Sequence, residues 1–413
     1  MKRPFFRILT LIIVFAGTVL TAACANLLEG SSETISPHIS APYERQPIEQ
    51  ITISDLEEFE ELLLELIMAQ EPVTTFQYNS FDSDDLQAEM RQISQELMES
   101  LPVVIYSVAN ITTTVSRFVT YYEVNIEIEF KRTLEQVESI VTTSTQRYMM
   151  TQLLEIMSRY EEEAIILTNL QLTRDEIIEM IVNIYYQNPR RIIMLPFVTV
   201  EIFPEEGTDR IYEIRFGYTE SPEMLRLLSR NLDLYVRQNA EHAVGETDAE
   251  ILLSLVELLM AGAVFDEGTA RTISMHGPQN FAATAFGALV RGSAVGEGFA
   301  MAFKALCDEL RFDCRIVLGY IDDKVHAWNL ILLEGHYYHI DVAMCSVEGL
   351  EAAFLKNDED IEENYTWDRE NTQRANGPLT LYDIIKDDDP TDGDGTDIDS
   401  STDTTDDNTG EED

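Results

Sequence analysis

Two β-rich runs near the C-terminus constrain the fold more than any other feature of this 413-residue chain. The runs are Val325 to Leu333 and His336 to Ala343, and both are dominated by apolar, β-branched and aromatic residues. Between them stands Glu334-Gly335, a typical two-residue hairpin turn. The pattern therefore predicts an antiparallel hairpin over residues 325–343.

The predicted register brings a histidine and an aspartate together. With Leu333 opposite His336, the register places His326 opposite Ala343. Because side chains alternate between the two faces of a strand, His326 and Asp341 share a face as diagonal neighbours, with their backbones roughly 7–8 Å apart. A carboxylate at that distance reaches an imidazole. The pair has the chemistry of the base and the orienting acid of a Cys-His-Asp triad.

A helix predicted from Glu297 to Leu310 precedes this hairpin, and its N-terminal amides would face the pair. The helix-opening turn "VGEGF", the run "HAWN" around His326 and the run "HIDV" around Asp341 together resemble the transglutaminase-like domains of bacterial surface proteins, which are relatives of the papain-type proteases. The resemblance implies a papain-like core, in which a helix packs on an antiparallel sheet. It covers residues 221–348 and is densest over 285–345.

The same resemblance places the nucleophilic cysteine of the family at Gly296. Glycine has no side chain, so catalysis through the usual thiolate is excluded. Two displaced nucleophiles remain as alternatives. Ser293 lies three residues earlier, and Cys345 is the other diagonal neighbour of His326 in the predicted register. The simpler expectation is an ordinary loop serine and a small buried cysteine.

The N-terminus carries an export signal. Met1-Lys2-Arg3 is followed by an apolar run from Ile8 to Leu20 and a small-residue site that ends in Cys24. This arrangement resembles a bacterial lipoprotein signal, which implies that residues 1–23 are removed and that Cys24 carries the lipid. The expected location is the outer face of the cytoplasmic membrane. An ordinary secretory peptide with an incidental Cys24 is the alternative.

Composition limits the partners and cofactors. A formal net charge of −47 repels phosphate, so nucleic acid is not an expected partner. The chain has no Cys/His spacing typical of a metal site, and we expect no cofactor. Cys307 and Cys314 form a disulfide bond or remain two buried thiols, and the sequence leaves both possibilities open.

The mature chain divides into a flexible tether over residues 24–50, an N-terminal α+β domain over 51–220, the transglutaminase-like domain over 221–386 and a disordered acidic tail over 387–413. In the N-terminal domain, the patterns predict a capping box that begins at Ser54, a helix over 84–98, a strand over 122–130, a long helix over 134–163, a helix capped by Thr173, and a hairpin of 197–203 with 210–218. We expect the strand and the hairpin to share one sheet.

These features predict an α+β protein. The predicted function is that of a lipid-anchored surface protein whose domain holds a peptide, a protein or a cell-wall ligand without covalent chemistry. Trp328, Glu297 and Asn329 are the expected binding residues of the vacated cleft, beside the triad remnants His326 and Asp341. One alternative is an acyltransferase, amidase or protease that uses Cys345 or Ser293. Another is a scaffold with no ligand in the cleft.

Overall fold

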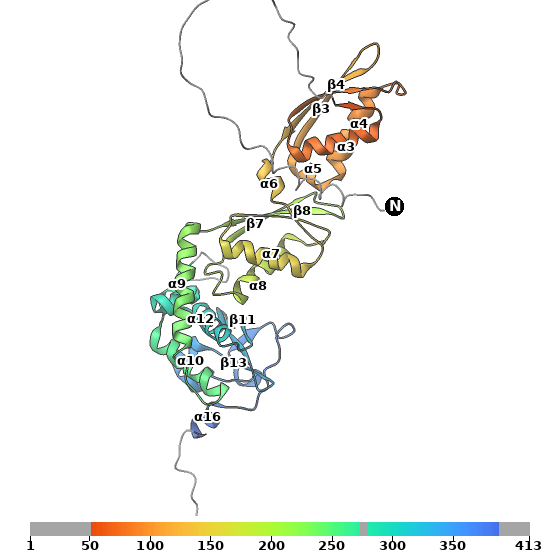
Figure 1. Cartoon of the computed structure of the whole chain (residues 1–413). Coiled ribbons are helices and arrows are strands. Elements are labelled where there is room, and N and C mark those ends of the chain that lie inside the picture. Colours follow the sequence, from red (N-terminus) through yellow and green to blue (C-terminus); the bar gives the residue numbers. More distant parts are fainter. Residues whose placement is uncertain (1–50, 273–279, 388–413) are drawn as a thin grey trace, which may run out of the picture. The chain divides into compact units, whose positions relative to one another are not determined.

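The computed structural model describes residues 51–272 and 280–387 (Figure 1). These residues mix helices with largely antiparallel sheets, in agreement with the predicted α+β class. Cys24, the rest of the export signal, the tether and residues 388–413 of the acidic tail lie outside the described residues, so the predictions for them stay predictions. In the described ranges, no helix is long and apolar enough to cross a membrane.

The first part of the chain, which we call the first module, is a four-stranded sheet with helices on one face (Figure 1). The strand order is β1-β2-β4-β3, with β1 parallel to β2 and the other pairs antiparallel. Alternate residues of β2 and β4 point toward the helices, and Phe76, Val124 and Ile126 form the centre of that core. The elements are β1 (Thr52–Ile53), α3 (Leu56–Ala69), β2 (Val73–Tyr78), α4 (Leu86–Ser100), α5 (Pro102–Ser107), β3 (Val108–Arg117) and β4 (Tyr122–Phe130).

The second module repeats this plan. Its sheet has the order β5-β6-β8-β7, again with one parallel pair followed by antiparallel pairs. A short linking helix, α6 (Leu134–Glu138), precedes it. The elements are β5 (Val141–Thr143), α7 (Gln146–Arg159), β6 (Glu163–Thr168), α8 (Arg174–Gln187), β7 (Phe197–Phe203) and β8 (Arg210–Gly217).

The two modules match residue by residue. Phe76 pairs with Val124 in the first sheet, and Ile166 pairs with Tyr212 at the same place in the second. The first helices agree as well: α3 and α7 both end at a residue in the left-handed region, Gln70 in one and Tyr160 in the other. At one constant sequence offset, the buried residues of the two helices also coincide, in the pairs Phe59 with Met149, Leu63 with Leu153, and Ile67 with Met157. The N-terminal region is therefore a structural duplication.

This architecture corrects three predictions. The strand predicted over 122–130 is β4, but it belongs to a different sheet from the hairpin of β7 and β8. The long helix predicted over 134–163 is wrong, because α6, β5 and α7 occupy that segment. The cap of α3 is Asp55 rather than Ser54. The capping box at Thr173 is confirmed.

The remaining residues surround a third sheet of order β13-β12-β11-β14, against which the helix α12 packs. Ser221 caps α9 with proline at the next position, and Thr247 caps α10 with a capping box. The elements are α9 (Pro222–Ala240), α10 (Asp248–Gly262), β9 (Val264–Phe265), α11 (Glu267–Ala270), η1 (Phe281–Ala283), η2 (Gly287–Arg291), β10 (Ser293–Ala294), α12 (Gly296–Glu309), β11 (Cys314–Ile321), β12 (Lys324–Leu333), β13 (His336–Ile340), α13 (Val342–Glu348), α14 (Leu350–Ala353), α15 (Asp358–Ile361), β14 (Tyr365–Trp367) and α16 (Leu381–Asp387).

Candidate functional site

The predicted hairpin is present as β12 and β13, and Leu333 pairs with His336 as expected. The pairing ends at Asn329 and Ile340, earlier than the sequence predicts. After Ile340 the chain turns into α13, so Ala343 is a helical residue and does not lie opposite His326 in the sheet. The physical reason is Asp341, which caps α13 by accepting a hydrogen bond from the backbone N–H of Met344.

The histidine and the aspartate meet, although not as neighbours within the paired part of the hairpin. His326 Nε2 lies 2.7 Å from Asp341 Oδ2. The same carboxylate oxygen accepts a hydrogen bond of 2.9 Å from the Tyr365 hydroxyl, and burial raises the pKa of that hydroxyl. With the Met344 N–H on its other oxygen, Asp341 is held by three groups. Sequence reasoning missed Tyr365, since it comes from β14 and no local pattern links it to the hairpin.

Gly296 lies at the first position of α12 and faces the imidazole. A Cβ placed on Gly296 would lie 2.5 Å from His326 Nδ1, and even closer to Cε1. That separation is far shorter than van der Waals contact, so the ring occupies the space that a side chain at position 296 would need. Gly296 is not in the left-handed region, so a side chain there is opposed by the imidazole and not by the backbone angles. The imidazole of His326 fills the space beside Gly296.

The cavity around this contact is small. Its volume is about 30 Å³, which is room for one or two water molecules. Its lining combines Gly296 and His326 with Tyr186 from the second module and Phe265 from β9. Among the described residues, a cavity of this volume has no room for a peptide or a sugar.

Glu297 reaches this cavity as predicted, but it contacts the protein itself. Its carboxylate accepts a hydrogen bond of 2.8 Å from the hydroxyl of Tyr186 in α8. Burial raises the pKa of Glu297 to about 7, although the hydrogen bond from Tyr186 opposes the shift. The side chain is thus partly protonated at neutral pH. Tyr186, which the sequence did not suggest, closes this side of the cavity.

The other two predicted binding residues are turned into the core. Trp328 is 1% exposed and Asn329 is fully buried. Trp328 Nε1 donates to His339 Nδ1 at 3.0 Å, and His339 Nε2 lies 2.9 Å from Asp358. Asn329 Nδ2 donates to the carbonyl oxygen of Ala300 at 3.0 Å. The expectation that Trp328 and Asn329 line the cleft is wrong, because hydrogen bonds inside the protein occupy these donors.

Neither displaced nucleophile is placed for attack. Cys345 lies in α13 and is fully buried, and burial raises the pKa of its thiol to about 12. Ser293 pairs with Val264 in the short β9–β10 ladder and is not among the residues that line the cavity. Cys307 and Cys314 are free and buried, so the alternative of two thiols is the one observed.

Comparisons with known proteins give little further information. No family model matches the chain, and no curated protein matches it. Among solved structures, the crystal structure of a TGase is similar at a TM-score of 0.26 and 11% identity, covering 52% of this chain and 60% of that one. A candidate cysteine protease from Cytophaga hutchinsonii is similar at a TM-score of 0.22 and 13% identity, covering 37% of this chain and 63% of that one. The chain thus spans about three fifths of each structure, and TM-scores this low assign no role to any residue.

Proposed function

We propose that this protein is an exported, lipid-anchored, non-enzymatic binding protein. Its C-terminal part is a transglutaminase-like domain that has lost its nucleophile and serves as a scaffold. Its ligand, a peptide, a protein or a cell-wall fragment, binds without covalent chemistry and outside the filled cleft. The observation that carries this proposal is the contact at Gly296, where the imidazole of His326 stands in the space of the absent side chain.

The arrangement of the pair supports a scaffold role for it. His326 is 10% exposed at its side chain, and Asp341 is 4% exposed. Buried polar groups that are fully bonded fix the packing of their neighbours. Here the bonded groups join β12, the start of α13 and β14, so the histidine–aspartate pair ties together three elements of the domain.

The enzymatic alternative is tested with the purified chain. We expect no transamidase or amidase activity on amide substrates. We also expect slow reaction of Cys307, Cys314 and Cys345 with iodoacetamide at neutral pH, because all three thiols are buried and burial raises the pKa of Cys307 and Cys345. Rapid labelling of Cys345, lost in a His326→Ala variant, would overturn the proposal and establish a displaced-nucleophile enzyme.

The scaffold role is tested by a double-mutant cycle. Gly296→Ala should lower the free energy of unfolding by about 1–3 kcal/mol, because its methyl group collides with the imidazole. In a His326→Ala background the ring is absent, so the same methyl group should cost close to nothing. Equal costs in both backgrounds would show that the imidazole does not fill this space.

The lipid anchor needs an experiment of its own. Expressed in a bacterium with lipoprotein processing, the full chain should sediment with membranes and incorporate labelled lipid, and Cys24→Ser should remove the label. If the Cys24→Ser form still carries lipid, the anchor is elsewhere and this part of the proposal is wrong.

A further inference from the structure

Residues from outside the second module pack on the outer face of its sheet, which is the side away from its helices. Tyr106 of the first module packs there with Ile165 and Ile211, and its ring meets Phe203 edge to face at 5.4 Å. Arg132, from the link between the modules, also lies on this face. Its guanidinium carbon is 4.8 Å from the ring centre of Tyr106.

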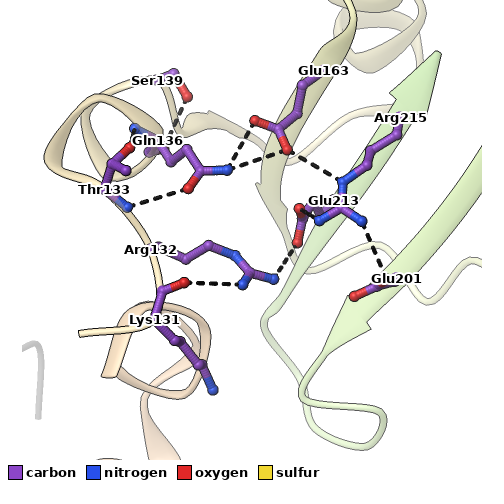
Figure 2. Close-up of polar contacts among 9 residues, drawn as sticks. All are labelled: Lys131, Arg132, Thr133, Gln136, Ser139, Glu163, Glu201, Glu213 and Arg215. Carbon is purple, nitrogen blue, oxygen red and sulfur yellow. Dashed lines mark hydrogen bonds and ion pairs between the residues drawn. The ribbon is translucent and has the colours of Figure 1, made fainter. Parts of the chain in front are cut away.

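Arg132 lies as a cation on the outer face of the second sheet. Its Nη2 donates to Glu213 Oε2 at 2.6 Å, and Arg215 bonds the other oxygen of the same carboxylate (Figure 2). Burial alone would raise the pKa of Glu213, but the hydrogen bond and charge of Arg132 hold it below its usual range. The outer face of this sheet thus holds a guanidinium between the ring of Tyr106 and the carboxylate of Glu213.

The sheet of the first module has the same strand order, but its outer face carries different side chains. Thr75 occupies the position of Ile165, and Glu123 that of Ile211, as the strand pairings show. Around them the face carries Gln77, Asn125, Glu127, Glu129, Thr112, Thr114 and Ser116. A helix like the one that carries Tyr106 would bury these polar groups without hydrogen-bond partners if it packed on this face. We therefore do not expect another copy of the module to bind here.

The carboxylates on this face are not neutralised within the described part of the chain. No ion pair there joins Glu123, Glu127 or Glu129 to a basic side chain, and Glu127 only accepts a hydrogen bond from Asn125. Residues 51–130 contain 16 acidic residues against two arginines. The charge of the whole module therefore favours a cationic partner over an anionic one.

An exposed aromatic cluster borders the face at the turn between β3 and β4. Phe118 is 45% exposed, and its ring stacks on Tyr121 with the ring centres 5.0 Å apart. Both residues continue the alternation that puts Ser116 and Glu123 on the outer face. Arg117 stands over Phe81 and Tyr122 at 5.8 Å, but on the helix side of the sheet, because it pairs with Tyr122 and Tyr122 packs against the inner core. The corresponding turn of the second module, residues 204–209, has no aromatic residue. Large exposed apolar side chains beside polar groups are typical of an interaction site.

We propose that the outer face of the first sheet, together with its aromatic border, docks a cationic polypeptide that presents lysine or arginine side chains. The glutamates supply the opposite charge, and the rings supply faces for stacking and cation–π contact. The second module provides the internal precedent, with Arg132 on the equivalent face. The surface is separate from the filled cleft, so its role does not depend on whether that cleft is catalytic.

The test uses the full mature chain with Cys24→Ser and a fluorescent peptide of alternating lysine and phenylalanine, followed by anisotropy at 0.15 M salt. The triple variant Glu123→Gln, Glu127→Gln and Glu129→Gln should weaken binding at least tenfold. The matched control changes three exposed glutamates on the helical side, Glu61, Glu65 and Glu99, to glutamine and removes the same charge. The control should weaken binding less than threefold. Because both variants keep the acidic tail, its attraction for the peptide cancels in the comparison.

Equal losses in the two triple variants would show general charge attraction and overturn the proposal, and so would the absence of binding. Phe118→Ala with Tyr121→Ala should weaken binding of the same peptide further, but should leave binding of a peptide of lysine and glycine unchanged. Sedimentation of the unmodified chain tests whether a second copy of the chain binds this face. A dimer that dissociates in the first triple variant would mean that the face binds a second copy, which also overturns the proposal. None of these outcomes bears on the activity of the cleft.

Discussion

In the second module, the outer face of the sheet lies beneath Tyr106 and Arg132, whereas in the first module the matching positions carry threonine, glutamine and glutamate. The strand order and the pairing register are the same, so the backbone does not cause the difference. In tandem arrays, each repeat covers its neighbour and the terminal repeat needs a polar outer surface. The first module meets this requirement, and its outer face is acidic as well as polar.

The largest expected effect is at Tyr106. Tyr106→Ala should lower stability by about 3–5 kcal/mol, because a fully buried ring leaves a cavity between the modules. Hydrogen exchange of amides in β6 and β8 measures this locally. Tyr106→Phe keeps the ring and serves as the control, with an expected change under about 1 kcal/mol. If alanine costs no more than phenylalanine, the outer face of the second sheet is not held by this contact.

Arg132 and Arg117 give the next comparison, since each stands over two aromatic rings. Arg132→Ala leaves the buried carboxylate of Glu213 with Arg215 as its remaining bonded cation, and should cost about 2–3 kcal/mol in the free energy of unfolding. Arg117→Ala removes only an exposed cation–π contact, worth about 0.5–1 kcal/mol. Denaturant unfolding of both variants checks the ranking. A larger loss for Arg117 would show that the contact of Arg132 with buried Glu213 contributes less to stability than an exposed cation–π contact.

Two glutamates should respond oppositely to pH. Arg132 lowers the pKa of Glu213 in the folded protein. The contribution of Glu213 to the free energy of unfolding is therefore present above the unfolded-state pKa and is lost as pH falls through the folded-state pKa. The pKa of Glu297 is raised to about 7, so stability is full below its unfolded-state pKa and lost as pH rises toward 7. Glu297→Gln should therefore gain on the order of 1 kcal/mol at pH 8, with little change at pH 4, while Glu213→Gln should lose stability at pH 8. Unfolding curves at both pH values measure this, and shifts of the same sign would contradict it.

Local sequence patterns predicted individual helices, strands and turns better than the way in which they combine into sheets and modules. The hairpin turn at Glu334-Gly335 and the capping box at Thr173 depend on neighbouring residues, so the sequence contains the whole signal. The duplication could not be recognised in the same way, because matched core positions such as Phe59 and Met149 differ in residue type and agree only in burial. A search for recurring cap and core positions at one constant offset would have revealed it.

The candidate site shows the same limit. Hairpin register predicts that His326 and Asp341 come close, and they do, although the β12–β13 pairing ends before it reaches either residue. The small size of the cavity depends on Tyr186, from a helix more than 100 positions earlier, and on the ring of His326, which lies in the space beside Gly296. Both are consequences of packing between distant segments, which residue spacing does not encode.

The smallest expected effect tests the polar face of the first module directly. Thr75→Ile introduces the residue that the second module has at the same position, Ile165. Thr75 is exposed, so the free energy of unfolding should change by no more than about 0.5 kcal/mol. The reverse change, Ile165→Thr, puts a hydroxyl into the buried contact with Tyr106 and should cost about 1–3 kcal/mol. Parallel denaturant unfolding of the two variants measures the asymmetry. If Thr75→Ile were as costly as Ile165→Thr, part of the protein would already cover the first face, and the acidic surface would not be available to a cationic polypeptide.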